Sequence, residues 1–251
     1  MITRHILILE ALPEHPLYAD AAYRLYAFLL EQLPAEESEW LHEEGNRMIS
    51  QFLKYSRESG TYTWTVCLLS DAASSVLSPV LERLREVFIE NCSFAIQARS
   101  CEKIGLEEFL SRGRENNQRY AQLQFQTVAS FKQNGRYVLF PQERLILQNL
   151  MMRWNETFPM CPLEDDDAFQ AILGGVCITD YNLRTARFSL KGIRIPGFIG
   201  SCRIDARLPL PLLELWNTLL AFADYSGIGI KTGLGMGGVM VKFQEDQKKT
   251  G

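Results

Sequence analysis

The first half of the chain alternates between short apolar segments and segments whose apolar residues follow a helical spacing. Residues 18–33 carry apolar side chains at positions 22, 25, 26, 29, 30 and 33, which is the pattern of an amphipathic helix. A second amphipathic pattern predicts a helix over residues 74–88. Around these helices, runs of apolar, β-branched and aromatic residues predict strands over 4–12, 61–71 and 92–104.

The second half repeats this order. Within residues 120–142, an Asn-Gly turn at 134–135 predicts two strands, and residues 143–158 have the spacing of a helix. The remaining predicted elements are strands over 174–190 and 193–208, a helix over 211–227 and a last strand over 239–243.

Two βαββαβ halves fit this order of elements. We therefore expect an α+β protein built from two tandem ferredoxin-like (RRM-like) domains. We place an N-terminal domain at residues 1–113 and a C-terminal domain at 119–251. The linker is expected in the polar window 111–119.

Length and composition bound the class of protein. A chain of 251 residues with 47% apolar content can bury a substantial core. No stretch approaches the roughly 18 apolar residues that would span a membrane. The start "MITRHILILEALPEHP" lacks the apolar run and the cleavage site of a secretory signal. We expect a cytoplasmic protein with no membrane partner.

Cysteine and histidine are few and scattered. None of the six cysteines forms a CxxC spacing, and only three histidines are present, so neither a zinc site nor a disulfide framework is expected. The acidic run at 164–168 is the natural candidate for a metal. Contiguous carboxylates in a loop are usually solvated, however, and no histidine or distant aspartate is an evident partner. We predict no metal and no cofactor.

The net charge of −4 conceals an asymmetry between the halves. Residues 1–115 carry 11 Lys/Arg against 18 Asp/Glu, whereas residues 116–240 carry 12 against 10. Within the second half, residues 180–207 hold six basic and two acidic side chains. Such a stretch is either an ordinary solvated face or a local positive field that attracts a polyanion.

Glycine is unusually dense near the C-terminus, where six of the twelve residues from Gly227 to Gly238 are glycine. Three interpretations compete: a nucleotide-phosphate loop, a tight structural turn, or a main chain against which a polyanion lies. A dinucleotide loop needs a strand before and a helix after it, the reverse of the order predicted here. A P-loop needs glycine before the Lys-Thr pair, but Ile230 stands there.

A simple turn needs only one or two glycines, and each further glycine costs backbone entropy on folding. The density therefore favours an open main chain whose N–H groups donate to the phosphates of a nucleic acid, with Lys231 adding charge.

A family resemblance starts from this stretch. Residues 222–239, "FADYSGIGIKTGLGMGGV", resemble the C-terminal signature of the repeat-associated mysterious protein (RAMP) superfamily. More narrowly, they resemble the CRISPR-associated endoribonucleases that cut precursor CRISPR RNA within its repeats, the sixth Cas protein family. Residues 123–155 are similar to the opening of that family's second domain. Residues 40–56 with the following "TWTVCLLSD" are similar to its first-domain histidine segment.

The resemblance implies two ferredoxin-like domains, an RNA substrate and metal-independent cleavage. In such cleavage the substrate's 2′-hydroxyl attacks the phosphate and leaves 2′,3′-cyclic phosphate and 5′-hydroxyl ends. Histidine suits the proton transfer because its ordinary pKa lies near neutral pH. His42 matches the family's catalytic histidine by its LHE context, whereas His5 in a predicted strand and His15 before a proline look structural.

A cation is expected beside His42 to offset charge on the phosphate. Arg47 and Lys54 are the two candidates, and the residues do not decide between them. The remaining site residues are assigned to RNA binding. They are Arg184, Arg187, Lys191, Arg194, Arg203, Gly227, Gly229, Lys231, Thr232, Gly233, Gly235, Gly237 and Gly238.

Three functions are therefore weighed. The leading one is an endoribonuclease that binds and cuts CRISPR repeat RNA. The second is a non-catalytic RNA-binding subunit of a CRISPR effector complex, in which other subunits of that complex are partners. The third is a regulatory domain that binds a nucleotide, which the failed phosphate-loop motifs disfavour.

Overall fold

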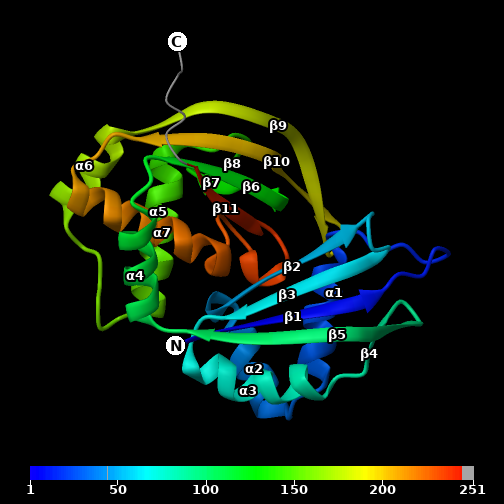
Figure 1. The fold of residues 1–251 in the computed structure, drawn as a ribbon. Coiled ribbons are helices and arrows are strands. Elements are labelled where there is room, and N and C mark those ends of the chain that lie inside the picture. Colours follow the sequence, from blue (N-terminus) through cyan, green and yellow to red (C-terminus); the bar gives the residue numbers. More distant parts are fainter. Residues whose placement is uncertain (44, 245–251) are drawn as a thin grey trace.

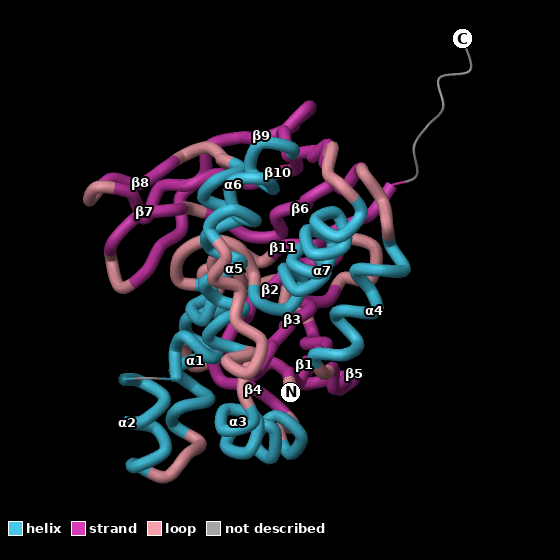
Figure 2. The backbone as a smooth tube through the Cα atoms, turned by 90° about the vertical axis from the view of Figure 1, so that its left-hand side faces the viewer, coloured by secondary structure: helices cyan, strands magenta, loops and turns pink. Residues whose placement is uncertain are grey.

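A computed structural model describes residues 1–43 and 45–244 and places two antiparallel sheets beside each other (Figure 1). Each sheet carries helices on one face. The turned view in Figure 2 shows α4, α5 and α7 gathered beside the second sheet, and α1, α2 and α3 beside the first. The α+β architecture of two ferredoxin-like halves that the sequence predicts is confirmed.

The first sheet has the strand order β2-β3-β1-β5-β4. Strands β2, β3, β1 and β5 follow the order of a ferredoxin-like domain, and β4 extends the edge. The elements of this half are β1 (Ile2–Glu10), α1 (Ala21–Glu31), α2 (Ala35–Glu43), the 3₁₀ turn η1 (Gly45–Met48), β2 (Ile49–Ser56), β3 (Thr61–Leu68), α3 (Asp71–Arg83), β4 (Glu86–Ile89) and β5 (Cys92–Ile104).

The second sheet has the order β11-β6-β10-β9, the same topology. Its half also contains a short β7-β8 hairpin at the predicted Asn-Gly turn. The elements are α4 (Leu106–Asn116), β6 (Tyr120–Ala129), β7 (Phe131–Gln133), β8 (Arg136–Val138), α5 (Glu143–Thr157), α6 (Asp166–Gly175), β9 (Val176–Leu190), β10 (Ile193–Ala206), α7 (Leu210–Ser226), the 3₁₀ turn η2 (Thr232–Leu234) and β11 (Val239–Gln244).

Alternation along β1 gives the first sheet two different faces. Leu7 and Leu9 are buried in the core that α1 and α3 close. Arg4 and Ile6 point to the opposite face and line a groove that also touches β11. One face of this sheet is therefore covered by its own helices, and the other faces the second half of the molecule.

The two halves share an apolar interface. Ile2 and Ile104 from the first half belong to the same buried cluster as the helices of the second. Cys67 and Leu69 of the first half belong to this cluster as well, and within the second half Phe109 of α4 packs edge-on against Trp154 of α5. The positions of the two sheets relative to each other are thus supported by continuous packing.

The polar window 111–119 is largely helical rather than an extended linker. Residues up to Asn116 belong to α4, which packs on α7. The contact is close: a Cβ added at Gly113 would lie 1.9 Å from Thr218 Oγ1. The domain boundaries at 113 and 119 stay a prediction.

The acidic run at 164–168, predicted as a solvated loop, begins a helix. The Asp165 carboxylate accepts a hydrogen bond from the N–H of Ala168 at 2.9 Å, and Asp166 and Asp167 lie in the first turn of α6. Negative charge stabilises a helix N-terminus, so capping accounts for these carboxylates.

Among the described residues, no helix is both long and apolar enough to cross a membrane.

Candidate active site

The predicted catalytic segment lies beside the glycine stretch (residues 227–238). His42 is exposed in the last turn of α2, and Arg47 is exposed in η1. The turn η1 packs against η2, which lies inside the glycine stretch. Two segments from opposite ends of the sequence therefore meet at one place on the surface.

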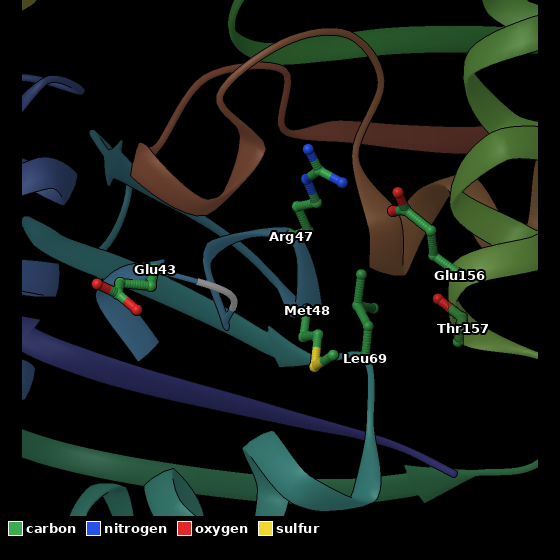
Figure 3. A pocket seen from close by; sticks show the side chains of 6 residues that line it. All are labelled: Glu43, Arg47, Met48, Leu69, Glu156 and Thr157. Carbon is green, nitrogen blue, oxygen red and sulfur yellow. The ribbon is translucent and has the colours of Figure 1, made fainter. Parts of the chain in front are cut away.

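Arg47 lines a pocket of about 480 Å³ between η1 and the C-terminal end of α5 (Figure 3). In Figure 3 the Arg47 side chain rises toward the glycine stretch, and Glu156 faces it from the end of α5. The other lining residues are Glu43, Met48, Leu69 and Thr157. Within the described part of the chain no ion pair engages Arg47, so its guanidinium is available to an anion.

Gln51, which sequence analysis missed, joins β2 to the glycine stretch. Its side chain is buried, and its Nε2 donates to the carbonyl oxygens of Gly233 and Ala22 at 3.0 Å each. Its Oε1 accepts a hydrogen bond from Trp64 Nε1 at 2.7 Å. Because the whole amide is satisfied, this network holds η2 against β2 and α1. The sequence feature that could have indicated Gln51 is a polar residue at an inward-facing position of an otherwise apolar strand.

The glycine stretch is buried, which makes the expectation of an open main chain wrong. An added Cβ would lie 2.5 Å from the Phe52 ring at Gly238 and 2.5 Å from the Ala22 side chain at Gly235. The chain packs so closely against both halves that larger residues do not fit. The buried residues of the stretch that sequence analysis assigned to RNA are Gly227, Gly229, Thr232, Gly233, Gly235, Gly237 and Gly238.

Many main-chain N–H groups of the stretch donate to acceptors inside the protein, which counts against a phosphate cradle built from those groups. Gly237 N–H donates to the carbonyl of Val128 at 2.9 Å, and Gly238 N–H donates to Thr127 Oγ1 at 3.0 Å. Gly227, Gly229 and Gly235 donate in the same way to protein acceptors. Because these donors are already paired, they do not offer hydrogen bonds to phosphates.

Lys231 is the exposed residue of the glycine stretch. Its side chain is exposed, and its backbone is left-handed with φ 57°. It immediately precedes η2, which packs against η1. A contact between Lys231 and RNA stays a prediction, but its physical basis is a side-chain charge and not the bare main chain.

The basic residues of 180–207 are divided between the two faces of the β9–β10 ladder. Arg184 and Arg203 pair opposite Ile199 and Asp180 at alternate register positions, so they share one face of the β9–β10 ladder. The other face is formed between them by odd-numbered positions of β9 and their even-numbered partners on β10. Arg187 and Arg194 lie there.

Two of the basic side chains are held by aromatic rings. Lys191 lies in the β9–β10 turn, with its Nζ 5.5 Å from the ring centre of Tyr23 on α1. The Arg203 guanidinium lies 4.6 Å from the ring centre of Tyr120. The tip of this hairpin therefore reaches the first half of the molecule.

Lys54 lies in a different place from Arg47. It lines a groove of about 410 Å³ between the two sheets. The rest of the groove lining is Arg4, Ile6, Phe52, Thr63, Thr65, Asp224, Val239 and Met240. Arg47, by contrast, shares its pocket with Glu43, the neighbour of His42.

Asp224 is the acidic group of this groove. Its Oδ1 accepts a hydrogen bond from Val241 N–H at 2.6 Å. Burial raises the pKa of Asp224 to about 7, although the Val241 N–H and the charges of Arg4 and Arg112 act in the opposite direction. The carboxyl is thus poised to ionise near neutral pH.

This raised pKa predicts that the free energy of unfolding falls as the pH rises toward neutrality. The folded state binds the Asp224 proton more tightly than the unfolded chain, so the stabilisation is complete below pH 3.8 and is lost through pH 7. The slope is at most about 1.4 kcal/mol per pH unit. Urea unfolding at pH 5, 6 and 7 should show this fall in the free energy of unfolding in the wild type. Asp224→Asn should lack the part of the fall that the Asp224 proton causes. Identical pH dependence in both proteins would contradict it.

This chain is similar to known proteins in both sequence and fold. The profile of the family described as CRISPR-associated endoribonuclease Cas6 matches residues 123–239. A Streptococcus thermophilus protein named CRISPR-associated endoribonuclease Cas6 is 30% identical over 235 residues, which cover 93% of this chain and 96% of that protein. A Mycobacterium tuberculosis protein of the same name is 28% identical, over 87% of this chain and 70% of its own length.

The fold is also similar to solved Cas6 structures. A Cas6 (TTHB231) product complex, whose protein comes from Thermus thermophilus, superposes with a TM-score of 0.80 at 22% identity, over 96% of this chain and 100% of that one. The likeness covers both ferredoxin-like halves. Together with the Streptococcus relative, these matches assign the chain to a family: it belongs to the CRISPR-associated endoribonucleases Cas6.

Proposed function

We propose that this protein cuts CRISPR repeat RNA in precursor crRNA without a metal ion, with the ribose 2′-hydroxyl as the nucleophile. The observation that carries the proposal is the packing of η1, which holds Arg47 and follows His42, against the glycine stretch. A product complex and a substrate-mimic complex of similar Cas6 proteins support RNA as the ligand.

His42 is assigned to proton transfer. It is exposed at the end of α2, where a bound ribose can reach its imidazole. Histidine can exchange a proton near neutral pH, and a positioned acid or base typically contributes about 10²–10⁴-fold to a rate. Attack by the 2′-hydroxyl breaks the bond from phosphorus to the 5′-oxygen, which leaves a 2′,3′-cyclic phosphate and a 5′-hydroxyl.

Arg47 is assigned to the scissile phosphate. Its guanidinium is free of ion pairs among the described residues and points toward the glycine stretch in Figure 3. A guanidinium can bind two phosphate oxygens at once and offset the charge that develops on them. Lys54, which lies in the groove between the sheets, is assigned to RNA binding outside the reacting centre.

The glycine stretch is assigned a structural part in RNA binding. Its packing fixes the backbone on which Lys231 is displayed next to η1. Arg184 lies on the polar face of the second sheet, in a hollow with Gln124 and Ser201. Arg187, Lys191, Arg194 and Arg203 supply further charge along the β9–β10 hairpin. Such charges give affinity for phosphates without reading sequence.

The test is a cleavage assay on a repeat RNA in excess EDTA, with added Mg²⁺ as a parallel arm. Equal single-turnover rates in both arms are expected because no step uses a metal. Strict dependence on Mg²⁺ would overturn the proposal. Tight binding without cleavage in either arm would favour the non-catalytic subunit of an effector complex instead.

A further inference from the structure

A histidine, a glutamate and a cysteine from three separate elements meet on the helical side of the first sheet. His5 lies on β1, Glu82 on α3 and Cys101 on β5, and their ligand atoms lie within 4.8 Å of one another. His5 and Cys101 are direct partners in the β1–β5 ladder. Among the described residues this is the group of side chains arranged to hold a metal ion.

We propose that these three side chains form a zinc site. Thiolate, imidazole and carboxylate are the three ligand types that zinc takes in proteins. The thiolate and the carboxylate together balance the charge of Zn²⁺, and the thiol proton is released to solvent on binding. This inference does not depend on the proposed cleavage mechanism.

The distances suit a tetrahedral ion. Zinc–sulfur and zinc–nitrogen bonds of about 2.3 and 2.0 Å at a tetrahedral angle place the two ligand atoms about 3.5 Å apart. Cys101 Sγ and His5 Nε2 are 3.9 Å apart. The hydroxyl of Ser78 lies 2.9 Å from the same nitrogen, so the ion replaces that hydrogen bond. Water completes the coordination.

The site combines a fixed ligand with two accessible ones. His5 is only 3% exposed and is held by strand pairing on both sides, whereas Glu82 and Cys101 are exposed. An ion therefore reaches the site from solvent without opening the core. Lys103, two residues from Cys101, opposes a cation, but the two anionic ligands outweigh its single charge.

Zinc at this place ties α3 to two central strands of the first sheet (Figure 1). It lies on the helical side, where α3 packs, and not in the groove that faces the second half. The expected role is structural, with stabilisation of the folded state and no part in RNA cleavage.

The experiment is a titration of the reduced, metal-free protein with Co²⁺ and then Zn²⁺. One equivalent of Co²⁺ should give a thiolate-to-cobalt charge-transfer band with the visible bands of a tetrahedral site, and Zn²⁺ should displace it with a dissociation constant on the order of 1 μM or tighter. Cys101→Ser should lose the charge-transfer band, and Glu82→Gln should weaken binding. Cys177→Ser, which removes another exposed cysteine, is the matched control and should bind like the wild type.

Thermal unfolding supplies a second readout. Zn²⁺ should raise the melting temperature of the wild type and of Cys177→Ser, but not that of Cys101→Ser, while the rate of RNA cleavage stays unchanged. A charge-transfer band that persists in Cys101→Ser would overturn the assignment. So would Zn²⁺ binding to the wild type weaker than about 100 μM.

Discussion

Replacing His42 with alanine is expected to slow single-turnover cleavage of repeat RNA by about 10²-fold or more. The imidazole is the proton-transfer group assigned to the reaction, and an alanine leaves water to replace it. His42 is exposed at the end of α2, so its loss should leave the fold and the affinity for RNA nearly unchanged. The measurement is the cleavage rate with saturating enzyme, together with the dissociation constant for a non-cleavable RNA.

His15→Ala is the matched control, because His15 is also exposed but lies outside the candidate site. It should cut at the wild-type rate. If His42→Ala also cuts at that rate, another group carries the proton transfer and the assignment of His42 is wrong. A loss of RNA affinity equal to the loss of rate would instead make His42 a binding residue.

Replacing Gly237 with alanine is expected to lower the stability of the folded protein strongly. Gly237 has φ 66°, and an added Cβ would lie 2.1 Å from the carbonyl oxygen of Ile228. That carbonyl belongs to the backbone, so it cannot move aside as a flexible side chain does. Combined with the strain of a left-handed backbone, the overlap should lower the free energy of unfolding by about 3 kcal/mol or more. Urea unfolding followed by circular dichroism measures this.

Gly192→Ala separates the two causes. Gly192 also has positive φ, at 79°, but an added Cβ there meets nothing within 4 Å. Its cost should be only the backbone strain, about 1–2 kcal/mol. Similar losses at Gly237 and Gly192 would show that close packing is not the reason for glycine in this stretch.

Much of the order of strands and helices could be predicted because apolar periodicity is a local property, but α2 and β2, which carry His42 and Gln51, were not among the predicted elements. The strand at 92–104 is observed as Cys92–Ile104, and the helix at 143–158 as Glu143–Thr157. The helix α4 was missed because its polar composition suggested a linker, and only Phe109 and Gly113 are buried. A strongly polar helix of this kind shows its buried stripe only once its partner α7 is known.

The composition of the glycine stretch does not show whether its main chain is open or closely packed. Glycine is equally suited to an open phosphate cradle and to a closely packed turn, and only the tertiary contacts distinguish them. Phe52 and Ala22, which exclude larger residues there, lie far away in the sequence. The three residues of the proposed zinc site, His5, Glu82 and Cys101, are also far apart in the sequence, so no short spacing motif indicates them.

The central claim is that the RNA's own 2′-hydroxyl performs the cleavage at the site beside η1, and the end groups of the products test it most directly. Repeat RNA cut in EDTA should yield a 5′ fragment that ends in a 2′,3′-cyclic phosphate and a 3′ fragment with a 5′-hydroxyl, as read by mass spectrometry. A 5′-phosphate on the downstream fragment would contradict the account, because it requires water as the nucleophile.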